Sequence, residues 1–486
     1  MPTSRGPFFE TTERGFSPST EGSPLLPIER IRRPDSPFLW GQLGILCYLR
    51  LLDPLNFTQI FPYVNEMIND LGIAKNPTHV GLYSGIVESS FAMCQLLAIC
   101  PWACASDRIG RRPVILMGIC GLALSALALG LSHNFVQLVV ARGLGGLFSG
   151  NVAVIPTVLC EITDEKSQSF AFPFFGLWWP VGSILGPLIG GTLAKPGNHF
   201  PRLLRYEVLN RNPYLLPCLV LFALTAFGAF LCCWLDETLE SKSDSYAPPE
   251  YGAVADSHGT PAPCSSPSMR ELMAVPFIRA LCVSSCSLSF VTTAFDVVFV
   301  LFCYSPIEQG GLAMSSTAIG YALAISGLMA AILQVFFMPF LLREYYHADI
   351  LHFCSGVWPY TFASMPLLSL VAQQSFSDRR ILWVGLALVL MAARVGSLGY
   401  SINTLLVKKY AKGSAIGSTN GLVQLHICLS RAISPTFVSW LFMFSASRNG
   451  TQKFLWIFVT VVLACTSHHL SRRVVVESRK LEYHEA

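Results

Sequence analysis

The chain has 486 residues, of which 52% are hydrophobic and only 13% are charged. Soluble globular proteins carry about 25% charged residues, so this composition excludes an ordinary soluble domain and indicates a membrane protein with many spans. The formal net charge of +4 is small, and the basic residues lie at the ends of apolar segments. No nucleic-acid partner is therefore expected.

Residues 1–37 are rich in Ser, Thr, Pro and Arg, which predicts a disordered cytoplasmic tail. Twelve apolar segments follow, each near the roughly 20 residues that a bilayer core requires. They lie near residues 39–61, 80–104, 114–132, 135–160, 169–193, 214–235, 277–303, 318–342, 350–372, 381–404, 418–445 and 453–470. The predicted fold is an all-α, polytopic membrane protein.

The twelve predicted spans fall into two groups of six. The polar segment 236–271 separates them and is predicted to be a flexible cytoplasmic linker. Arg142 and Pro187 in the first group occupy places similar to those of Arg394 and Pro435 in the second. This weak repeat predicts two pseudo-symmetric six-helix bundles, at residues 38–235 and 272–470, with a cytoplasmic tail at 471–486.

Lys and Arg are concentrated on the segments that are cytoplasmic if both termini lie in the cytoplasm. The positive-inside rule therefore predicts cytoplasmic termini. In the first tail, Glu21 followed by Leu25-Leu26 resembles an acidic dileucine sorting signal. The expected location is the plasma membrane, or a vacuolar or endosomal membrane.

A charged loop at residues 106–113 separates the second and third spans. Its arginines favour the cytoplasmic side. Asp107 can pair with them or cap a helix, Gly110 permits a tight turn, and Pro113 suits the first turn of a helix. The arginines of this loop are Arg108, Arg111 and Arg112.

Gly182, Gly186 and Gly190 recur every four residues in the fifth span and therefore share one helix face. A glycine face allows another helix to approach closely. Pro187 removes a backbone hydrogen bond and permits bending, and Gly191 extends the motif.

Three charged residues are predicted to lie at a similar depth inside the first six spans. Arg142, Glu88 and Asp53 are each roughly 10–12 Å below the outer edge, at a rise of 1.5 Å per residue. Either carboxylate could exchange protons next to the arginine, and Asp53 is also spaced to pair with Arg50. The alternative is a structural ion pair buried in the bundle.

Spans ten and eleven carry polar residues on shared helix faces. Such faces inside a membrane line an interior instead of contacting lipid, so a central cavity that holds the substrate is expected. Asp296, near the outer end of span seven, is expected to be solvated. The predicted cavity residues are Asn56, Trp178, Arg394, Asn420, Gln424 and Arg431.

Three of these motifs resemble those of the major facilitator superfamily of transporters. The loop D-R-x-G-R-R over 107–112 resembles the family's signature loop, and R-x-x-x-G over 142–146 resembles its fourth-span motif. The sequence G-x-x-x-G-P-x-x-G-G over 182–191 resembles the antiporter motif of the drug:proton branch. The resemblance covers residues 38–470 and is greatest to fungal multidrug and tetracycline-resistance-like transporters.

The resemblance implies roles for several residues. Arg142 would take part in proton coupling, and the Asp53-Pro54 step favours Asp53 over Glu88 as its partner. Asp107 and Glu161 would belong to a cytoplasmic charge network, the cytoplasmic latch. One departure is Ala103, where the family's loop motif begins with glycine.

The expected function is secondary active transport, in which a small organic molecule such as a drug, toxin or metabolite is exported in exchange for protons. The expected partners are this substrate, protons and the lipid bilayer, and the protein is expected to be a monomer. Direct ATP hydrolysis is not expected, since no ATP-binding G-x-x-x-x-G-K-S/T loop is present. No enzymatic activity, metal or cofactor is expected either, since the sequence has no His-rich metal cluster and no H-E-x-x-H motif. The alternatives are a facilitator or proton symporter on the same fold, and a non-transporting membrane sensor or scaffold.

Overall fold

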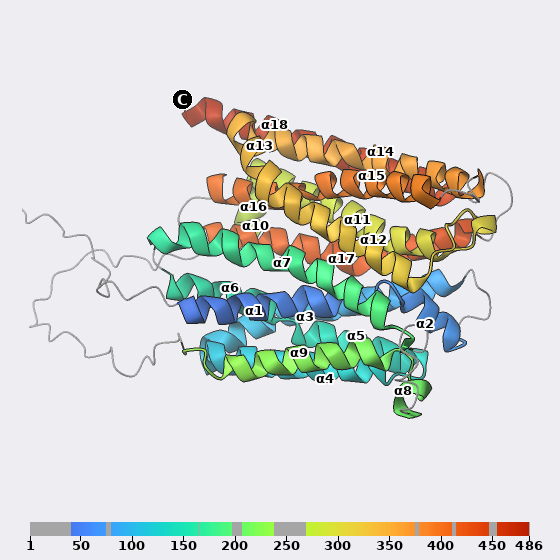
Figure 1. Ribbon diagram of the computed structural model, residues 1–486. Helices are drawn as coiled ribbons and strands as arrows, with labels where there is room; N and C mark the ends of the chain where they lie inside the picture. The colour runs from blue at the N-terminus through green and yellow to red at the C-terminus, as the bar shows by residue number, and fades with distance from the viewer. Residues whose placement is uncertain are drawn as a thin grey trace, which may run out of the picture. The chain divides into compact units, whose positions relative to one another are not determined.

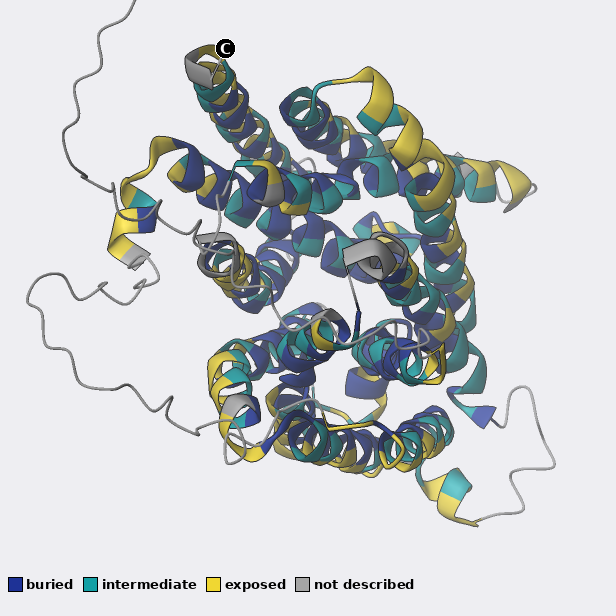
Figure 2. Cartoon of the chain, turned by 90° about the vertical axis from the view of Figure 1, so that its left-hand side faces the viewer, coloured by how far each residue is buried: buried dark blue, intermediate teal, exposed yellow. Residues whose placement is uncertain are grey.

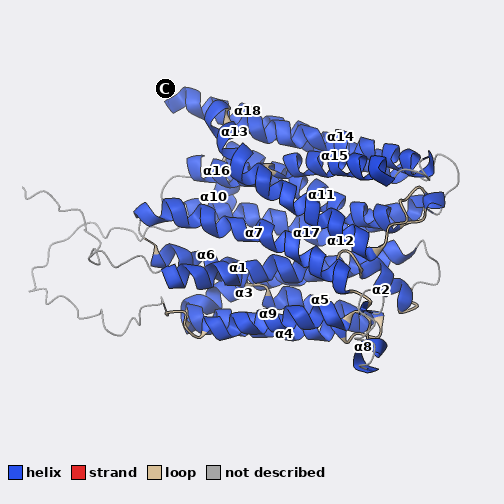
Figure 3. Cartoon of the chain, viewed as in Figure 1, coloured by secondary structure: helices blue, strands red, loops and turns tan. Residues whose placement is uncertain are grey.

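The structure is a computed structural model that describes residues 40–73, 79–163, 165–196, 207–237, 269–374, 379–410, 415–446 and 454–485. The predicted N-terminal tail and most of the predicted linker fall outside these ranges. Within them every regular element is a helix and none is a strand (Figure 3). The all-α prediction is therefore confirmed.

The first half of the described chain, residues 40–237, contains nine helices, all labelled in Figure 1. They are α1 (Trp40–Thr58), α2 (Val64–Asp70), α3 (Val80–Ile109), α4 (Arg111–Gly130), α5 (Phe135–Phe148), α6 (Asn151–Ile162), α7 (Glu165–Leu193), α8 (Glu207–Arg211) and α9 (Leu215–Cys232).

The second half, residues 269–485, also contains nine α-helices among its described residues. They are α10 (Met269–Ala274), α11 (Pro276–Tyr304), α12 (Ser316–Ile332), α13 (Met338–Glu344), α14 (His347–Gln374), α15 (Arg379–Ser397), α16 (Gly399–Tyr410), α17 (Ala415–Ala446) and α18 (Leu455–Glu485). A π-helical turn, Leu333–Phe337, joins α12 to α13.

Nine segments in the described residues are long and apolar enough to cross a membrane. Three of them combine two helices, namely α5 with α6, α12 with α13, and α15 with α16. The other three predicted spans fall on α1, α14 and α18, so the predicted count of twelve is not confirmed. These three helices are more polar: α1 carries Arg50 and Asp53, for example, and α18 continues to Glu485.

Helices of each half pack on one another, and two helix pairs make the most extensive contacts between the halves. The first pair is α3 with α17, and the second is α7 with α12 (Figure 1). The second predicted span of each half therefore contacts the fifth predicted span of the other half. This exchange of partners is what a two-fold relation between repeats produces.

The apolar surface agrees with a bilayer environment. In the end-on view of Figure 2, buried residues lie on the sides of helices that face other helices, and exposed residues lie mainly on the outer sides. Large apolar side chains such as Leu97, Val136 and Leu388 are 67%, 69% and 67% exposed. Water would penalise such a surface, whereas lipid accepts it.

Candidate functional site

The middle of α1 carries Arg50 and Asp53, which face different partners. The Asp53 carboxylate accepts a hydrogen bond of 2.6 Å from Ser149 Oγ, at the turn between α5 and α6. The Arg50 guanidinium lies over the rings of Phe175 and Trp179 in α7, 5.4 and 5.0 Å from their centroids. Asp53 and Arg50 influence each other electrostatically, but no ion pair joins them within the described chain.

Arg142 is only 4% exposed and closes the C-terminal end of α1. Its Nη1 donates 3.0 Å to the carbonyl oxygen of Asn56, and its Nη2 donates 2.6 Å to that of Phe57. Carbonyl groups in the last turn of a helix have no partner within the helix, so the guanidinium satisfies two of them. Its carbon also lies 5.5 Å from the ring centroid of Phe57 and 4.6 Å from that of Phe91.

Glu88 lies in α3 and is 5% exposed. It is within electrostatic reach of Arg142 and of Asp296, although it forms an ion pair with neither in the part of the chain described. Of the three residues of the coupling hypothesis, Glu88 and Arg142 thus lie within electrostatic reach of each other, whereas the charged residues recorded near Asp53 are Arg50 and Arg431. The direct carboxylate–arginine pair that the sequence suggested stays a prediction.

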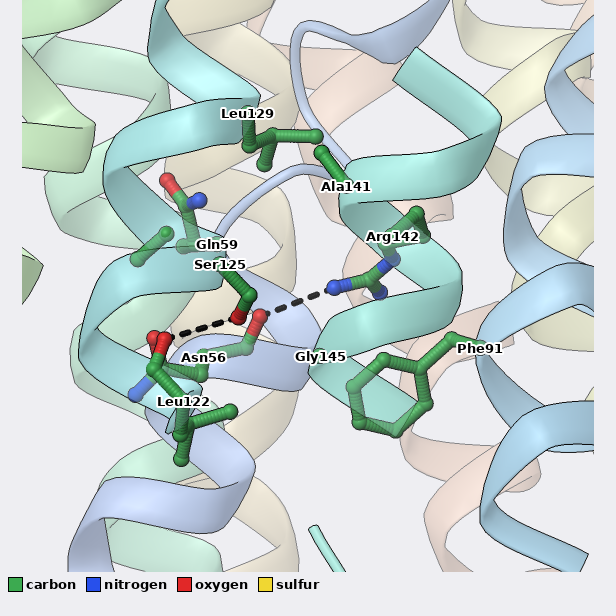
Figure 4. A pocket seen from close by; sticks show the side chains of 10 residues that line it. Asn56, Gln59, Phe91, Leu122, Ser125, Leu129, Ala141, Arg142 and Gly145 are labelled. Atoms are coloured by element: carbon green, nitrogen blue, oxygen red, sulfur yellow. Dashed lines mark hydrogen bonds between the residues drawn. The ribbon is translucent and has the colours of Figure 1, made fainter. Parts of the chain in front are cut away.

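A small cavity lies beside Arg142, inside the first half (Figure 4). The cavity has a volume of about 10 Å³, which is room for about one water molecule. Asn56, Gln59 and Ser125 give the cavity its polar lining. Asn56, predicted in the substrate cavity, also donates hydrogen bonds to the carbonyl of Leu52 and to Thr225 Oγ1 within the first half.

The other predicted cavity residues take different positions. Trp178 packs against the core of the first half, and Asn420 and Gln424 in α17 are exposed. Arg394 forms an ion pair of 2.7 Å with Asp296. The expectation that Asp296 is simply solvated is therefore wrong. Sequence alone does not show that α11 and α15 bring these two charges together.

Arg431 in α17 reaches from the second half to the first. Its guanidinium carbon lies 4.8 Å from the ring centroid of Phe57 in α1, and it influences Asp53 electrostatically. The interior between the halves therefore contains charged groups contributed by both of them.

The loop at residues 106–113 is a sharp turn between α3 and α4. Gly110 has a φ of 117°, which non-glycine residues rarely adopt. Arg111 forms an ion pair of 3.1 Å with Glu161, and its Nη1 donates 2.6 Å to Ser106 Oγ. The side chain of Asp107 lies outside the described residues, so its part in the latch stays a prediction.

The same turn has a further partner that sequence reasoning missed. Glu237 accepts hydrogen bonds from the backbone N–H groups of Arg111 and Arg112, at 2.8 and 3.0 Å. Arg112 also donates 2.5 Å to the carbonyl of Cys233, whereas Arg108 is exposed. A carboxylate at a helix N-terminus is favourable, whereas the sequence places Glu237 in the predicted linker 236–271.

The glycine face of α7 packs directly on α1. A Cβ on Gly186 would lie 2.2 Å from Thr58 Oγ1, and one on Gly190 would lie 1.9 Å from the carbonyl oxygen of Gln59. Gly191 instead faces the second half, where a Cβ would lie 2.9 Å from the Cα of Gly320 in α12. The motif residues Gly182, Gly186, Pro187, Gly190 and Gly191 thus hold α7 against both α1 and α12.

A polar cluster lies at the opposite end of α7 from the loop and was also missed. Lys195 Nζ pairs with Glu66 at 2.6 Å and with Asp70 at 2.7 Å. Burial lowers the pKa of Lys195, but the two carboxylates outweigh it and raise the pKa above its usual value. Tyr214 donates 2.5 Å to Asp70, and Ser316 of the second half hydrogen-bonds to Glu66.

Comparison with known proteins places this chain in a defined family. Residues 46–435 match the family model described as Major Facilitator Superfamily. The chain is 34% identical to the major facilitator-type transporter psiT2 of Psilocybe cyanescens, over 88% of this chain and 89% of that protein. It is 30% identical to the efflux pump azaK of Aspergillus niger, over 91% of this chain and 90% of that protein.

Solved structures show the same fold. A D-xylose-proton symporter superimposes with a TM-score of 0.67 and 13% identity, over 89% of this chain and 97% of its own. The human organic anion transporter MFSD10 gives a TM-score of 0.59 and 19% identity, over 89% and 99% of the two chains. The family match over residues 46–435 and the 34% identity to psiT2 show that the chain belongs to the major facilitator superfamily of membrane transporters.

Proposed function

We propose that this protein is a secondary active transporter that exports a small organic molecule in exchange for protons. The observation that carries the proposal is the presence of buried Glu88 and Arg142 and half-buried Asp53 inside the bundle, because ionisable residues inside a membrane mark ion and substrate pathways. Within the described chain neither carboxylate forms an ion pair. Each is therefore available to bind a proton.

Export is supported by two observations. The close packing of α7 on α1 uses the glycines of the motif that resembles the antiporter signature. Relatives of the chain include an efflux pump of Aspergillus niger and a multidrug transporter of Aspergillus fumigatus. Both observations favour a transporter that moves its substrate out of the cytoplasm.

Of the two carboxylates, Glu88 is the better candidate for the proton-binding group on the contacts of the two side chains, although the sequence resemblance favoured Asp53. Asp53 already accepts a hydrogen bond from Ser149, which stabilises its charge. Glu88 is buried and has no hydrogen-bond partner among the described residues. A buried charge without a partner is costly, and proton binding removes that charge.

Transport would proceed by alternating access, with the two halves rocking around a site between them. Contacts such as Gly191 with Gly320 and Ser89 with Thr436 would close one end of the pathway and then part. The bias of Lys and Arg supports cytoplasmic termini, in the plasma membrane or a vacuolar or endosomal membrane. A single chain supplies both halves, so a monomer suffices.

The test uses purified protein in proteoliposomes, with a pH gradient as the only driving force and a panel of small organic acids, bases and neutral compounds. The wild type should accumulate at least one compound while protons flow in the opposite direction. Glu88→Gln should keep substrate exchange but lose accumulation. Glu207→Gln is the control, because Glu207 is exposed in α8 and pairs only with Arg211 among the described residues.

Asp53→Asn and the double variant test the rival assignment. Accumulation that survives in both single variants and in the double variant would contradict a coupling role for this group. Protons that move in the same direction as the compound would indicate a symporter. A wild type without any flux across the panel would favour the non-transporting sensor or scaffold.

A further inference from the structure

Two arginines inside the helical bundle lack an anionic partner. Arg50 lies in α1 of the first half and Arg431 in α17 of the second, and both are half-buried. Within the described part of the chain, neither guanidinium makes an ion pair or a hydrogen bond, and their recorded contacts are with aromatic rings. The Nε of Arg50 is buried and unsatisfied.

The other two arginines inside predicted spans have partners for their Nη groups, although the Nε of each is buried without a hydrogen-bond partner among the described residues, as in Arg50. Arg394 pairs with Asp296, and Arg142 donates to two carbonyl groups at the end of α1. A buried polar group without a partner is costly, and a charge inside a membrane normally has one or faces a water-filled cavity. Arg50 and Arg431 therefore depart from the pattern that the rest of the bundle follows.

Both unpaired arginines are close to a single carboxylate. Arg50 and Arg431 each influence Asp53 electrostatically, one from its own helix and one from the opposite half. Asp53 itself is already engaged by Ser149 Oγ at 2.6 Å. Counted by themselves, with Asp53 ionised, these three side chains carry a net charge of +1, and Arg431 also lies within electrostatic reach of Arg142.

We propose that Arg50 and Arg431 bind an acidic group of the transported molecule, a carboxylate or a phosphate. This inference rests on the proposed transport function and names the class of its substrate. The planar guanidinium group matches such oxyanions through paired N–H donors. The rings of Phe57, Phe175 and Trp179 beside the arginines suit an apolar or aromatic body on the same molecule.

The charge count agrees with export in exchange for protons. One monoanion neutralises the group formed by Arg50, Arg431 and an ionised Asp53, so substrate binding needs no additional proton there. The proton can then be carried at the separate Glu88. An anion that leaves the cytoplasm also moves down the electrical gradient of an inside-negative membrane.

The test measures the binding of acids and their uncharged analogues to the purified full-length protein. The melting temperature is recorded with 1-naphthoate against 1-naphthamide, and with phenyl phosphate against phenol. At least one acid should stabilise the wild type while its uncharged analogue does not. The dissociation constant of that acid should rise about tenfold or more in Arg431→Gln and in Arg50→Gln, because each variant removes a hydrogen bond to a charged group.

Two variants complete the design. Arg431→Lys keeps the charge and should bind the acid more tightly than Arg431→Gln, though less tightly than the wild type. Arg211→Gln, in the exposed α8, removes an arginine outside the bundle and should bind as the wild type does. Size-exclusion profiles and melting temperatures without ligand identify a variant that fails to fold, in which case Arg431→Lys and the wild-type comparison decide.

The inference is overturned if no acid in the set binds the wild type, if the uncharged analogues bind equally well, or if Arg431→Gln retains full affinity. The experiments distinguish a failure of the proposed substrate class from a failure of the proposed transport function. Acid binding without any pH-driven flux would refute the proposed function alone. Proton-coupled flux of an uncharged compound, with no preference for acids, would refute only the substrate class.

Discussion

The guanidinium of Arg142 is held inside the first half by neutral groups. Its two donors reach the carbonyl groups of Asn56 and Phe57, where α1 ends within the bundle. The nearest carboxylate influence comes from Glu88, without an ion pair among the described residues. Arg142 thus has a structural role, because it closes α1, and its positive charge also influences the Glu88 carboxylate electrostatically.

Replacing Arg142 by Gln should lower the melting temperature as well as remove coupling. Each buried carbonyl left without a donor costs about 1–3 kcal/mol. Arg142→Lys keeps the charge but loses the fork of donors, so its melting temperature should lie between those of the wild type and Arg142→Gln. Thermal unfolding of the purified proteins measures this, and an unchanged melting temperature in Arg142→Gln would contradict the closing of α1.

Glu237 supports the turn into α4 from the end of the first half. Its carboxylate accepts hydrogen bonds from the backbone N–H groups of Arg111 and Arg112, as a capping side chain does. Glu237→Ala should therefore cost about 1 kcal/mol of stability. Glu207→Ala, in the exposed α8, is the matched control, and an equal fall in melting temperature for both variants would argue against capping.

Single residues differed in how far the sequence revealed their roles. Arg142, Asp53 and Glu88 could be singled out because a charge within an apolar segment is unusual. The partners of Arg142 could not be found, since backbone carbonyls carry no sequence signature and depend on where α1 ends. Glu237 was missed for a related reason, because its role arises only when the end of the first half returns to α4.

Helices were predicted well in position but not in continuity. Apolar length located nearly every span, yet the fourth span is broken into α5 and α6 at Ser149 and Gly150. The pattern of apolar residues in the sequence does not reveal such a break, because apolar residues continue on both sides of it. The break has a consequence, since it places the hydroxyl of Ser149 against the Asp53 carboxylate.

The glycine face of α7 allows a direct test at the scale of one helix. A Cβ on Gly190 would lie 1.9 Å from the backbone oxygen of Gln59, directly after the end of α1, whereas Gly176 in the same helix has nothing within 4 Å of its added Cβ. Gly190→Ala must therefore push α7 away from α1, and it should lower both stability and transport. Gly176→Ala should be close to wild type in both assays, and similar behaviour of the two variants would contradict the close-packing role.

The relation between the halves was anticipated from a weak internal repeat, and the helix contacts agree with it. The reciprocal pairs α3 with α17 and α7 with α12 could not be read from the sequence, because each involves residues more than a hundred positions apart. The polar link between Glu66 and Ser316 was invisible for the same reason. Small and polar groups take part in these contacts, among them Gly191 with Gly320 and Ser89 with Thr436, and small residues allow helices in a membrane to approach closely.

Covalent linkage of the halves should stop transport. Ser89 in α3 and Thr436 in α17 share a hydrogen bond of 2.8 Å between their side-chain oxygens, so cysteines at these positions would lie close enough for a disulfide. In a background without the native cysteines, oxidised Ser89→Cys/Thr436→Cys protein should lose flux and regain it on reduction. The reason is that alternating access requires the two halves to move against each other.

A second cysteine pair separates this explanation from general damage by oxidation. Ser287 in α11 and Ser467 in α18 are 3.1 Å apart at their oxygens, and both belong to the second half. A disulfide there leaves the two halves free to move, so Ser287→Cys/Ser467→Cys should transport at the same rate whether oxidised or reduced. If the Ser89–Thr436 pair forms its disulfide quantitatively and flux continues unchanged, the α3–α17 contact is not one that opens, and movement would have to occur elsewhere between the halves.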